Sequence, residues 1–180
     1  HDPAKARAFL REAGYPDGFE TELWYPKGYL GRIPEAVQED LRIAGIRVVL
    51  RPVFASVLNE KVSTRRQTQM CLWGWIVDFP DATTFFDPTL NGAKISEKQC
   101  LNYPFYSNPE VNRLIVQADR TFDPGERKQM LRRMESLTMQ DAPWAPLIHE
   151  SRSFLCHPRL RGFQGHLVWM YRLEKLWLDE

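Results

Sequence analysis

The sequence is poor in the features that mark the extremes of protein class. Its three cysteines include no CxxC pair, so neither a thioredoxin-like redox site nor a zinc knuckle is indicated. Its 24 basic and 23 acidic residues leave a formal net charge of +1, which gives no support for nucleic acid as a partner. No apolar run approaches the roughly 18 residues of a membrane span. These absences leave an ordinary globular protein.

Motifs of common catalytic chemistry are also missing. No GxGxxG, GxxxxGK[ST] or GxSxG occurs, so the phosphate-binding loops and the nucleophile elbow have no support. The four histidines are scattered and never stand at metal-ligand spacing from a second ligand. The sequence therefore predicts no metal, no cofactor and no enzymatic activity. The alternative is a hydrolase or transferase assembled from distant groups, and it would use Asp78, Asp81 and His149.

The first half of the chain alternates between helical and extended patterns. A chain of 180 residues can bury about 70% of the surface that its unfolded form exposes, which suits one domain. Asp2 and Pro3 predict the start of a helix that Gly14 ends. The pattern then predicts a strand at 19–25, a helix at 33–44, a strand at 46–50, a short helix at 55–63 and a strand at 68–73. This alternation predicts a single α/β domain over residues 1–180.

The second half is predicted to be mainly helical. Residues 88–108 show no period and are expected to form a long surface loop, which either borders a site or is a plain solvated excursion. Asn108-Pro109 and Asp123-Pro124 predict the starts of two helices, the second reaching about Asp141. The expected inward-facing residues of these helices are Val111, Leu114, Ile115, Ala118, Phe122, Met130, Leu131, Met134 and Leu137. Segments 147–149 and 153–155 are extended candidates, 158–165 is rich in turn residues, and 167–178 fits a closing strand or short helix.

Residues 70–81, MCLWGWIVDFPD, form the most informative segment. A strand would place Trp73 and Trp75 on one face, because side chains two residues apart point the same way, and would leave Asp78 in the following loop. Tryptophan rings and a carboxylate suit a cationic organic ligand. The alternative is that the tryptophans are core and that Asp78 closes a turn. Asp81 is assigned to structure, as a cap for a helix that begins after it.

The cysteines allow at most one disulfide bond. Cys71 lies in the apolar run and is expected to be a buried thiol. Cys100 and Cys156 lie in loop-like sequence and are able to bridge in an oxidising compartment. The sequence leaves that pairing open.

Several segments taken in order resemble the C-terminal half of the family 5 solute-binding proteins, the peptide- and nickel-type receptors of bacterial ABC importers. The similarity runs along nearly the whole chain, and each segment alone is a weak signal. The resembling segments are DPAKA at 2–6, EAGYPDGF at 12–19, LRIAGIRV at 41–48, WIVDFP at 75–80, YSNPEV at 106–111 and APWAPL at 142–147.

The resemblance implies one lobe of a type II periplasmic-binding-protein fold, with a central mixed sheet flanked by helices. It implies the second lobe plus C-terminal tail of a two-lobed receptor whose first lobe is absent, and His1 as the start of a fragment. The implied partners are a small-molecule or peptide ligand, the missing N-terminal lobe and the membrane subunits of an ABC importer. The implied location is periplasmic or extracellular, with membrane association in Gram-positive bacteria.

The resemblance also implies a ligand-binding site. In peptide-binding members an aspartate three residues after a tryptophan holds the α-ammonium group of the ligand, which corresponds to Asp78 after Trp75. Trp75 and Trp73 would form an apolar wall. Some oligopeptide binders carry an arginine where this chain has Leu72, so a tripeptide with a free carboxylate is not indicated. Other solutes, including nickel complexes and sugars, remain open, as does a protein-interaction module that uses the exposed cleft face.

Overall fold

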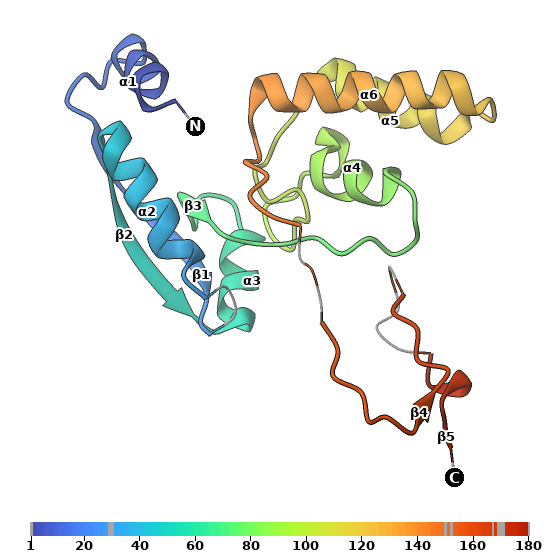
Figure 1. Ribbon diagram of the computed structural model, residues 1–180. Helices are drawn as coiled ribbons and strands as arrows, with labels where there is room; N and C mark the ends of the chain where they lie inside the picture. Colours follow the sequence, from blue (N-terminus) through green and yellow to red (C-terminus); the bar gives the residue numbers. More distant parts are fainter. Residues whose placement is uncertain are drawn as a thin grey trace. The chain divides into compact units, whose positions relative to one another are not determined.

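The computed structural model describes residues 2–28, 31–149, 151, 153–166, 168 and 172–179 (Figure 1). These residues fall into two compact units. The first comprises residues 1–74 and 94–105, and the second comprises residues 75–93 and 106–180. The expectation of one α/β domain over the whole chain stays a prediction. Each unit is described by itself.

The first unit is a parallel sheet with helices. Its elements are α1 (Pro3–Glu12), β1 (Phe19–Pro26), α2 (Ile33–Ala44), β2 (Ile46–Val53), α3 (Ala55–Val62) and β3 (Met70–Cys71). The strand order is β2-β1-β3, and both pairings are parallel. The α/β class is thus confirmed. The sequence predicted a mixed sheet, whereas the sheet of this unit is entirely parallel. It is parallel because a helix after each of β1 and β2 returns the chain to the same end of the sheet.

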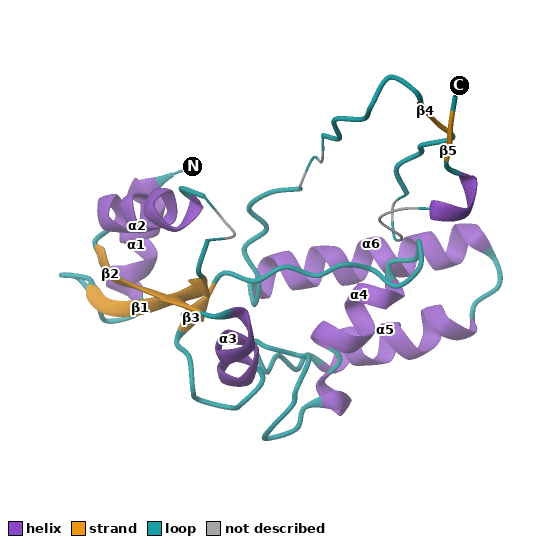
Figure 2. Ribbon diagram, turned by 90° about the horizontal axis from the view of Figure 1, so that it is seen from below, coloured by secondary structure: helices purple, strands orange, loops and turns teal. Residues whose placement is uncertain are grey.

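The core of the first unit lies between the sheet and α2, which covers one sheet face in Figure 2. Leu23, Val48 and Leu72 are buried there, and Ile33, Val37 and Leu41 of α2 pack against them. Tyr25, Ile46 and Leu50 also pack against this cluster, and the alternate residues of β1 and β2 point to the opposite face, as the two-residue period of a strand requires. There Glu20 pairs with Arg47 at 3.5 Å and Glu22 with Arg51 at 2.6 Å.

A close glycine contact joins the ends of two elements in this unit. Gly45 ends α2 in the left-handed conformation, with φ +105°. Gly18, with φ +75°, lies so near that a Cβ atom added to it would stand 1.7 Å from the Gly45 carbonyl oxygen. Only glycine fits at position 18, because both its backbone conformation and the space around it exclude a side chain.

The second unit is built around three helices. They are α4 (Thr83–Leu90), α5 (Pro109–Arg120) and α6 (Pro124–Asp141). The starts predicted for the last two are confirmed, since Asn108 accepts hydrogen bonds from the backbone N–H groups of Glu110 and Val111, and Asp123 accepts one from Glu126. The buried cluster consists of Phe86, Leu90, Val111, Leu114, Ile115, Ala118, Met134 and Leu137.

The remaining elements are short. The 3-10 helix η1 (Gly92–Lys94) follows α4, and η2 (Leu173–Lys175) precedes β5 (Trp177–Leu178), which pairs antiparallel with β4 (Leu160–Arg161). The predicted closing segment 167–178 therefore includes a strand, although residues 167 and 169–171 lie outside the described residues. The described residues within 147–149 and 153–155 form no strand, contrary to the extended prediction. None of the helices in the described ranges is both long and apolar enough to cross a membrane.

The strand predicted at 68–73 is wrong in extent, because β3 contains Met70 and Cys71 alone. Leu72 still donates a backbone hydrogen bond to the Trp24 carbonyl oxygen at 2.8 Å. The next bond of a parallel ladder would be donated by residue 26 of β1, which is a proline without an N–H group. The ladder therefore ends at Leu72, and Trp73 and Trp75 do not share a strand face.

Candidate functional site

The candidate region of the first unit lies at the carboxyl ends of β1 and β3. In the order β2-β1-β3 the chain passes from β1 to β2 on one side, and β3 then pairs on the other side of β1. Ligands of open α/β sheets bind beyond the carboxyl ends of the strands at such a reversal of strand order. Trp73 comes two residues after the end of β3 and belongs to this region.

Trp73 contacts an aromatic residue that the sequence interpretation did not include in the site. The rings of Trp73 and Tyr103 meet edge to face, with centroids 6.2 Å apart and planes at 90°. Burial raises the pKa of the Tyr103 hydroxyl, and a hydrogen bond from Trp73 acts in the opposite direction. Tyr103 thus remains neutral at physiological pH. The one sequence signal for it was its place in the irregular segment 88–108.

The cysteines are free thiols in this structure. Cys71 is half-buried rather than buried as predicted, and desolvation still raises the pKa of its thiol to about 11, which keeps it protonated and unreactive. Cys100 is 1% exposed, and its Sγ donates to the Asn102 carbonyl oxygen. Cys156 is exposed. The structure forms no bridge between Cys100 and Cys156, the pairing that the sequence left open.

A separate candidate region in the second unit is the loop before α4. The indole N–H of Trp75 donates to the Thr84 carbonyl oxygen at 2.9 Å, which holds this ring against the start of α4. Asp78 lies three residues further on and is exposed. Within the described ranges its carboxylate takes no hydrogen bond or ion pair. Asp78 is therefore available to a ligand.

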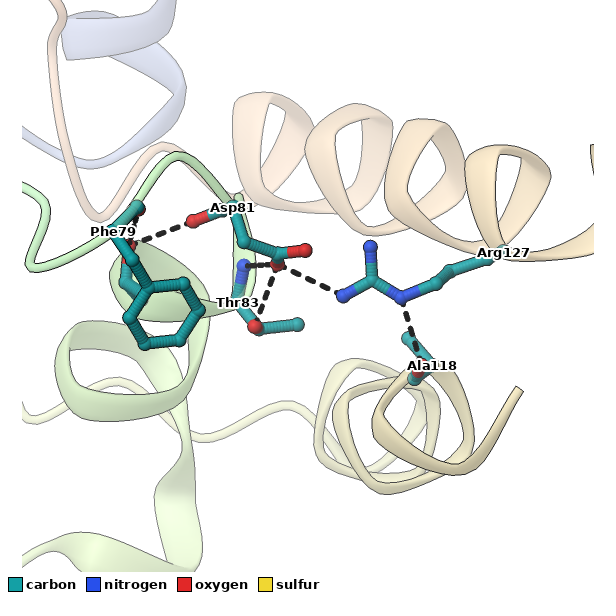
Figure 3. A network of polar contacts seen from close by, with 6 residues as sticks. Phe79, Asp81, Thr83, Ala118 and Arg127 are labelled. Atoms are coloured by element: carbon teal, nitrogen blue, oxygen red, sulfur yellow. Dashed lines mark hydrogen bonds and ion pairs between the residues drawn. The ribbon is translucent and has the colours of Figure 1, made fainter. Parts of the chain in front are cut away.

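Asp81 differs from Asp78 because one oxygen of its carboxylate, Oδ1, accepts several hydrogen bonds (Figure 3). Its Oδ1 accepts hydrogen bonds from the backbone N–H and hydroxyl of Thr83, at 2.8 and 2.7 Å, and from the Arg127 guanidinium at 2.8 Å. The Nε of Arg127 also donates to the Ala118 carbonyl oxygen at 3.0 Å. The Arg127 hydrogen bond is the main cause that lowers the pKa of Asp81 to about 2. The structural role predicted for Asp81 is confirmed, although the N-cap position of α4 is Ala82 and Asp81 binds the N–H of Thr83 from one residue earlier.

The two aspartates allow a matched test of stability. We expect Asp81→Asn to lower the free energy of unfolding by about 1–2 kcal/mol at neutral pH, since the engaged side chains are partly screened by solvent. Asp78→Asn should change it by less than about 0.5 kcal/mol. Urea denaturation of both variants measures the difference. Equal effects of the two substitutions would contradict the assignment.

The lowered pKa of Asp81 predicts that its contribution to the free energy of unfolding depends on pH. The pKa of Asp81 is lower in the folded state than in the unfolded state, where it is about 4. The stabilisation is therefore complete above about pH 4 and disappears as the pH falls through about 2, so the wild type and Asp81→Asn should converge in acid.

The residues predicted for the site are divided between the two units. Trp73 belongs to the first unit, whereas Trp75 and Asp78 belong to the second. His149, named for the hydrolase alternative, is exposed. Asp81 is bound to Arg127, so it is not the free second carboxylate that this alternative requires. Among the described residues no group of three or more His, Cys, Asp or Glu side chains is placed to hold a metal ion.

Sequence comparison relates the chain to binding proteins. Residues 1–97 match the family described as bacterial extracellular solute-binding proteins, family 5 Middle. The glutathione-binding protein GsiB of Escherichia coli strain K12 is 30% identical over 169 residues, which cover 91% of this chain and 33% of GsiB. The chain thus spans about a third of the length of this relative.

Solved structures show the same fold. The periplasmic binding protein DppA from Helicobacter pylori, in complex with the peptide STSA, superposes with a TM-score of 0.87 and 24% identity, over 99% of this chain and 35% of DppA. The dipeptide binding protein from Pseudoalteromonas sp. SM9913, in complex with Met-Leu, gives a TM-score of 0.83 and 26% identity, over 99% of this chain and 36% of that protein. The predicted periplasmic-binding-protein fold is confirmed.

Proposed function

Because the chain belongs to the family 5 bacterial extracellular solute-binding proteins, we propose that it is the ligand-side lobe of an ABC-importer receptor for peptides or similar amine-bearing solutes. Two relatives support this ligand class. GsiB is named as a glutathione-binding protein, and the Pseudoalteromonas protein holds Met-Leu. Both ligands carry an amino group. The family consists of binding proteins rather than enzymes.

The observation that carries the proposal is the contrast between two neighbouring carboxylates. The Asp81 carboxylate accepts hydrogen bonds from Arg127 and from the backbone at the start of α4, whereas Asp78 is exposed and engages none of the described residues. A charge-assisted hydrogen bond to an ammonium group contributes about 1.5–3 kcal/mol. Asp78 is the proposed anchor for the ligand ammonium.

The tryptophans supply the apolar part of the proposed site. Trp75 is held in one orientation by its hydrogen bond to the Thr84 carbonyl oxygen. A ligand that binds there therefore avoids the entropic cost of immobilising the ring. Trp73 and Trp75 would offer ring faces to apolar or cationic groups.

The proposed partners follow from the family. The lobe would close on a ligand together with a further N-terminal lobe and deliver it to the membrane subunits of the importer. The proposed location is the periplasm or the cell exterior, with membrane association in Gram-positive bacteria.

The anchor is tested in the whole receptor with a peptide and its N-acetylated form. Asp78→Asn should weaken binding of the free peptide at least tenfold, about 1.4 kcal/mol. Acetylation should weaken wild-type binding similarly and have little further effect on the variant, because both changes remove the same ion pair. Calorimetry measures the four affinities.

The control for this test is Asp119→Asn, which removes an exposed carboxylate of α5 and should leave the affinity unchanged. An Asp78→Asn receptor that binds the free peptide as tightly as the wild type would disprove the anchor. The second candidate function is a protein-interaction module, which predicts that the whole receptor binds neither form of the peptide. Ile76 and Phe79, which are 67% and 56% exposed beside Asp78, are the observation behind that candidate.

A further inference from the structure

The segment 94–105 is tied firmly to the loop that follows α3. The backbone N–H of Arg65 donates to the Glu97 carbonyl oxygen at 3.1 Å, and that of Cys100 donates to the Ser63 carbonyl oxygen at 3.0 Å. Cys100 is 1% exposed and Asn102 is fully buried. The segment is thus anchored by buried residues immediately before Tyr103.

The backbone of this segment is strained on both sides of Tyr103. Gln99 and Phe105 have φ angles of +56° and +51°. Residues other than glycine rarely adopt this left-handed backbone conformation. Arg65 covers the Phe105 ring, with its guanidinium carbon 5.4 Å from the ring centroid. Strained residues persist only where the surrounding structure holds them, and they gather at functional sites. The strain at Gln99 and Phe105 therefore indicates that the segment that carries Tyr103 is held in place by its surroundings and is a candidate for a functional role.

Trp73 needs such support, because the sheet no longer holds it. The ladder between β1 and β3 ends with the bond from Leu72 to Trp24. Beyond that point Trp73 meets the edge-to-face ring of Tyr103. Aromatic rings in this geometry attract each other beyond the area that they bury. Tyr103 therefore fixes the indole in place of the missing strand.

We propose that Tyr103 is a positioning residue that holds the Trp73 indole beyond β3, and that this pair makes the receptor favour peptides with bulky apolar side chains over those with small ones. The proposal rests on the proposed function, because it presumes a peptide ligand. The ring held by Tyr103 presents apolar surface without further ordering, so a larger apolar side chain gains more from it.

The test measures the affinities of the whole receptor for two dipeptides, Met-Leu and Ala-Ala. The ratio of the two affinities is the readout. Trp73→Ala should lower this ratio about tenfold, and Tyr103→Ala about fivefold, because an unsupported indole loses part of its contact. Tyr103→Phe keeps the ring and should retain most of the ratio. Tyr15→Ala, which removes an exposed tyrosine whose ring lies tilted against that of Phe19, is the control and should leave the ratio unchanged.

A second measurement tests the positioning without any ligand. The indole N–H resonance of Trp73, assigned in a nitrogen-15 spectrum through Trp73→Phe, should shift in Tyr103→Ala because that variant lacks the ring that meets the indole edge to face. An unmoved resonance would overturn the positioning role.

The outcomes separate this inference from the proposed function. An unchanged Met-Leu to Ala-Ala ratio in Trp73→Ala, in a receptor whose peptide binding still depends on Asp78, overturns the selectivity and leaves the proposed function standing. A wild-type receptor that binds neither peptide overturns both, and the indole resonance still decides whether Tyr103 positions Trp73.

Discussion

Gly18→Ala is expected to lower the free energy of unfolding by about 2–4 kcal/mol. Two effects add in this variant. The residue at position 18 must keep a φ of +75°, and its new Cβ would stand 1.7 Å from the Gly45 carbonyl oxygen. The overlapping atom belongs to the backbone at the end of α2, so the strand and the helix would have to move apart. Urea denaturation followed by circular dichroism measures the loss.

Gly14→Ala is the matched control for this substitution. Gly14 has a similar φ of +87°, but nothing lies within 4 Å of the position that its Cβ would take. It therefore isolates the backbone effect, and we expect a loss of about 1 kcal/mol. Equal losses at Gly14 and Gly18 would show that the contact with Gly45 does not restrict position 18.

Met134→Ala should have a comparable effect on the second unit, with a loss of about 2–5 kcal/mol. Met134 is fully buried in the cluster that joins α4, α5 and α6. Its removal takes apolar atoms from the core and leaves a cavity that the helices close only in part. The measurement is again the urea midpoint, read together with the slope of the transition.

Met139→Ala is the control for this core substitution, since it makes the same chemical change on the same helix. Met139 is 53% exposed, and its loss should change the stability by less than about 0.5 kcal/mol. Similar losses at the two positions would contradict the assignment of the α4, α5 and α6 cluster as the core of this unit.

Much of the fold could be predicted from the sequence where the signals are local. Asn108 and Asp123 cap the helices that follow them, and each capping bond spans two or three residues. The apolar spacing of α5 likewise predicted its buried face. Phe122 is the exception, because α5 ends at Arg120 and leaves this ring 99% exposed.

The site could be predicted less well because its determinants are distant in the sequence. Pro26 ends the ladder that would have carried Trp73, although 47 residues of chain separate the two. Arg127 lies 46 residues from Asp81, the carboxylate that it engages. Tyr103 reaches Trp73 from a segment without any period. Residue patterns led to the ligand role of Asp78, which stays a prediction, whereas the surroundings of each group depend on tertiary contacts.

The division of the first unit into residues 1–74 and 94–105 bears on how the protein is made. During synthesis α4 must leave the ribosome before residues 94–105 can do so. Ser63 accepts a backbone hydrogen bond from Cys100, and Arg65 donates one to Glu97. Neither bond can form until that later segment has left the ribosome. The three strands of the sheet come before α4, but the first unit is completed only after part of the second unit has been synthesised, and until then the loop after α3 lacks its hydrogen-bond partners.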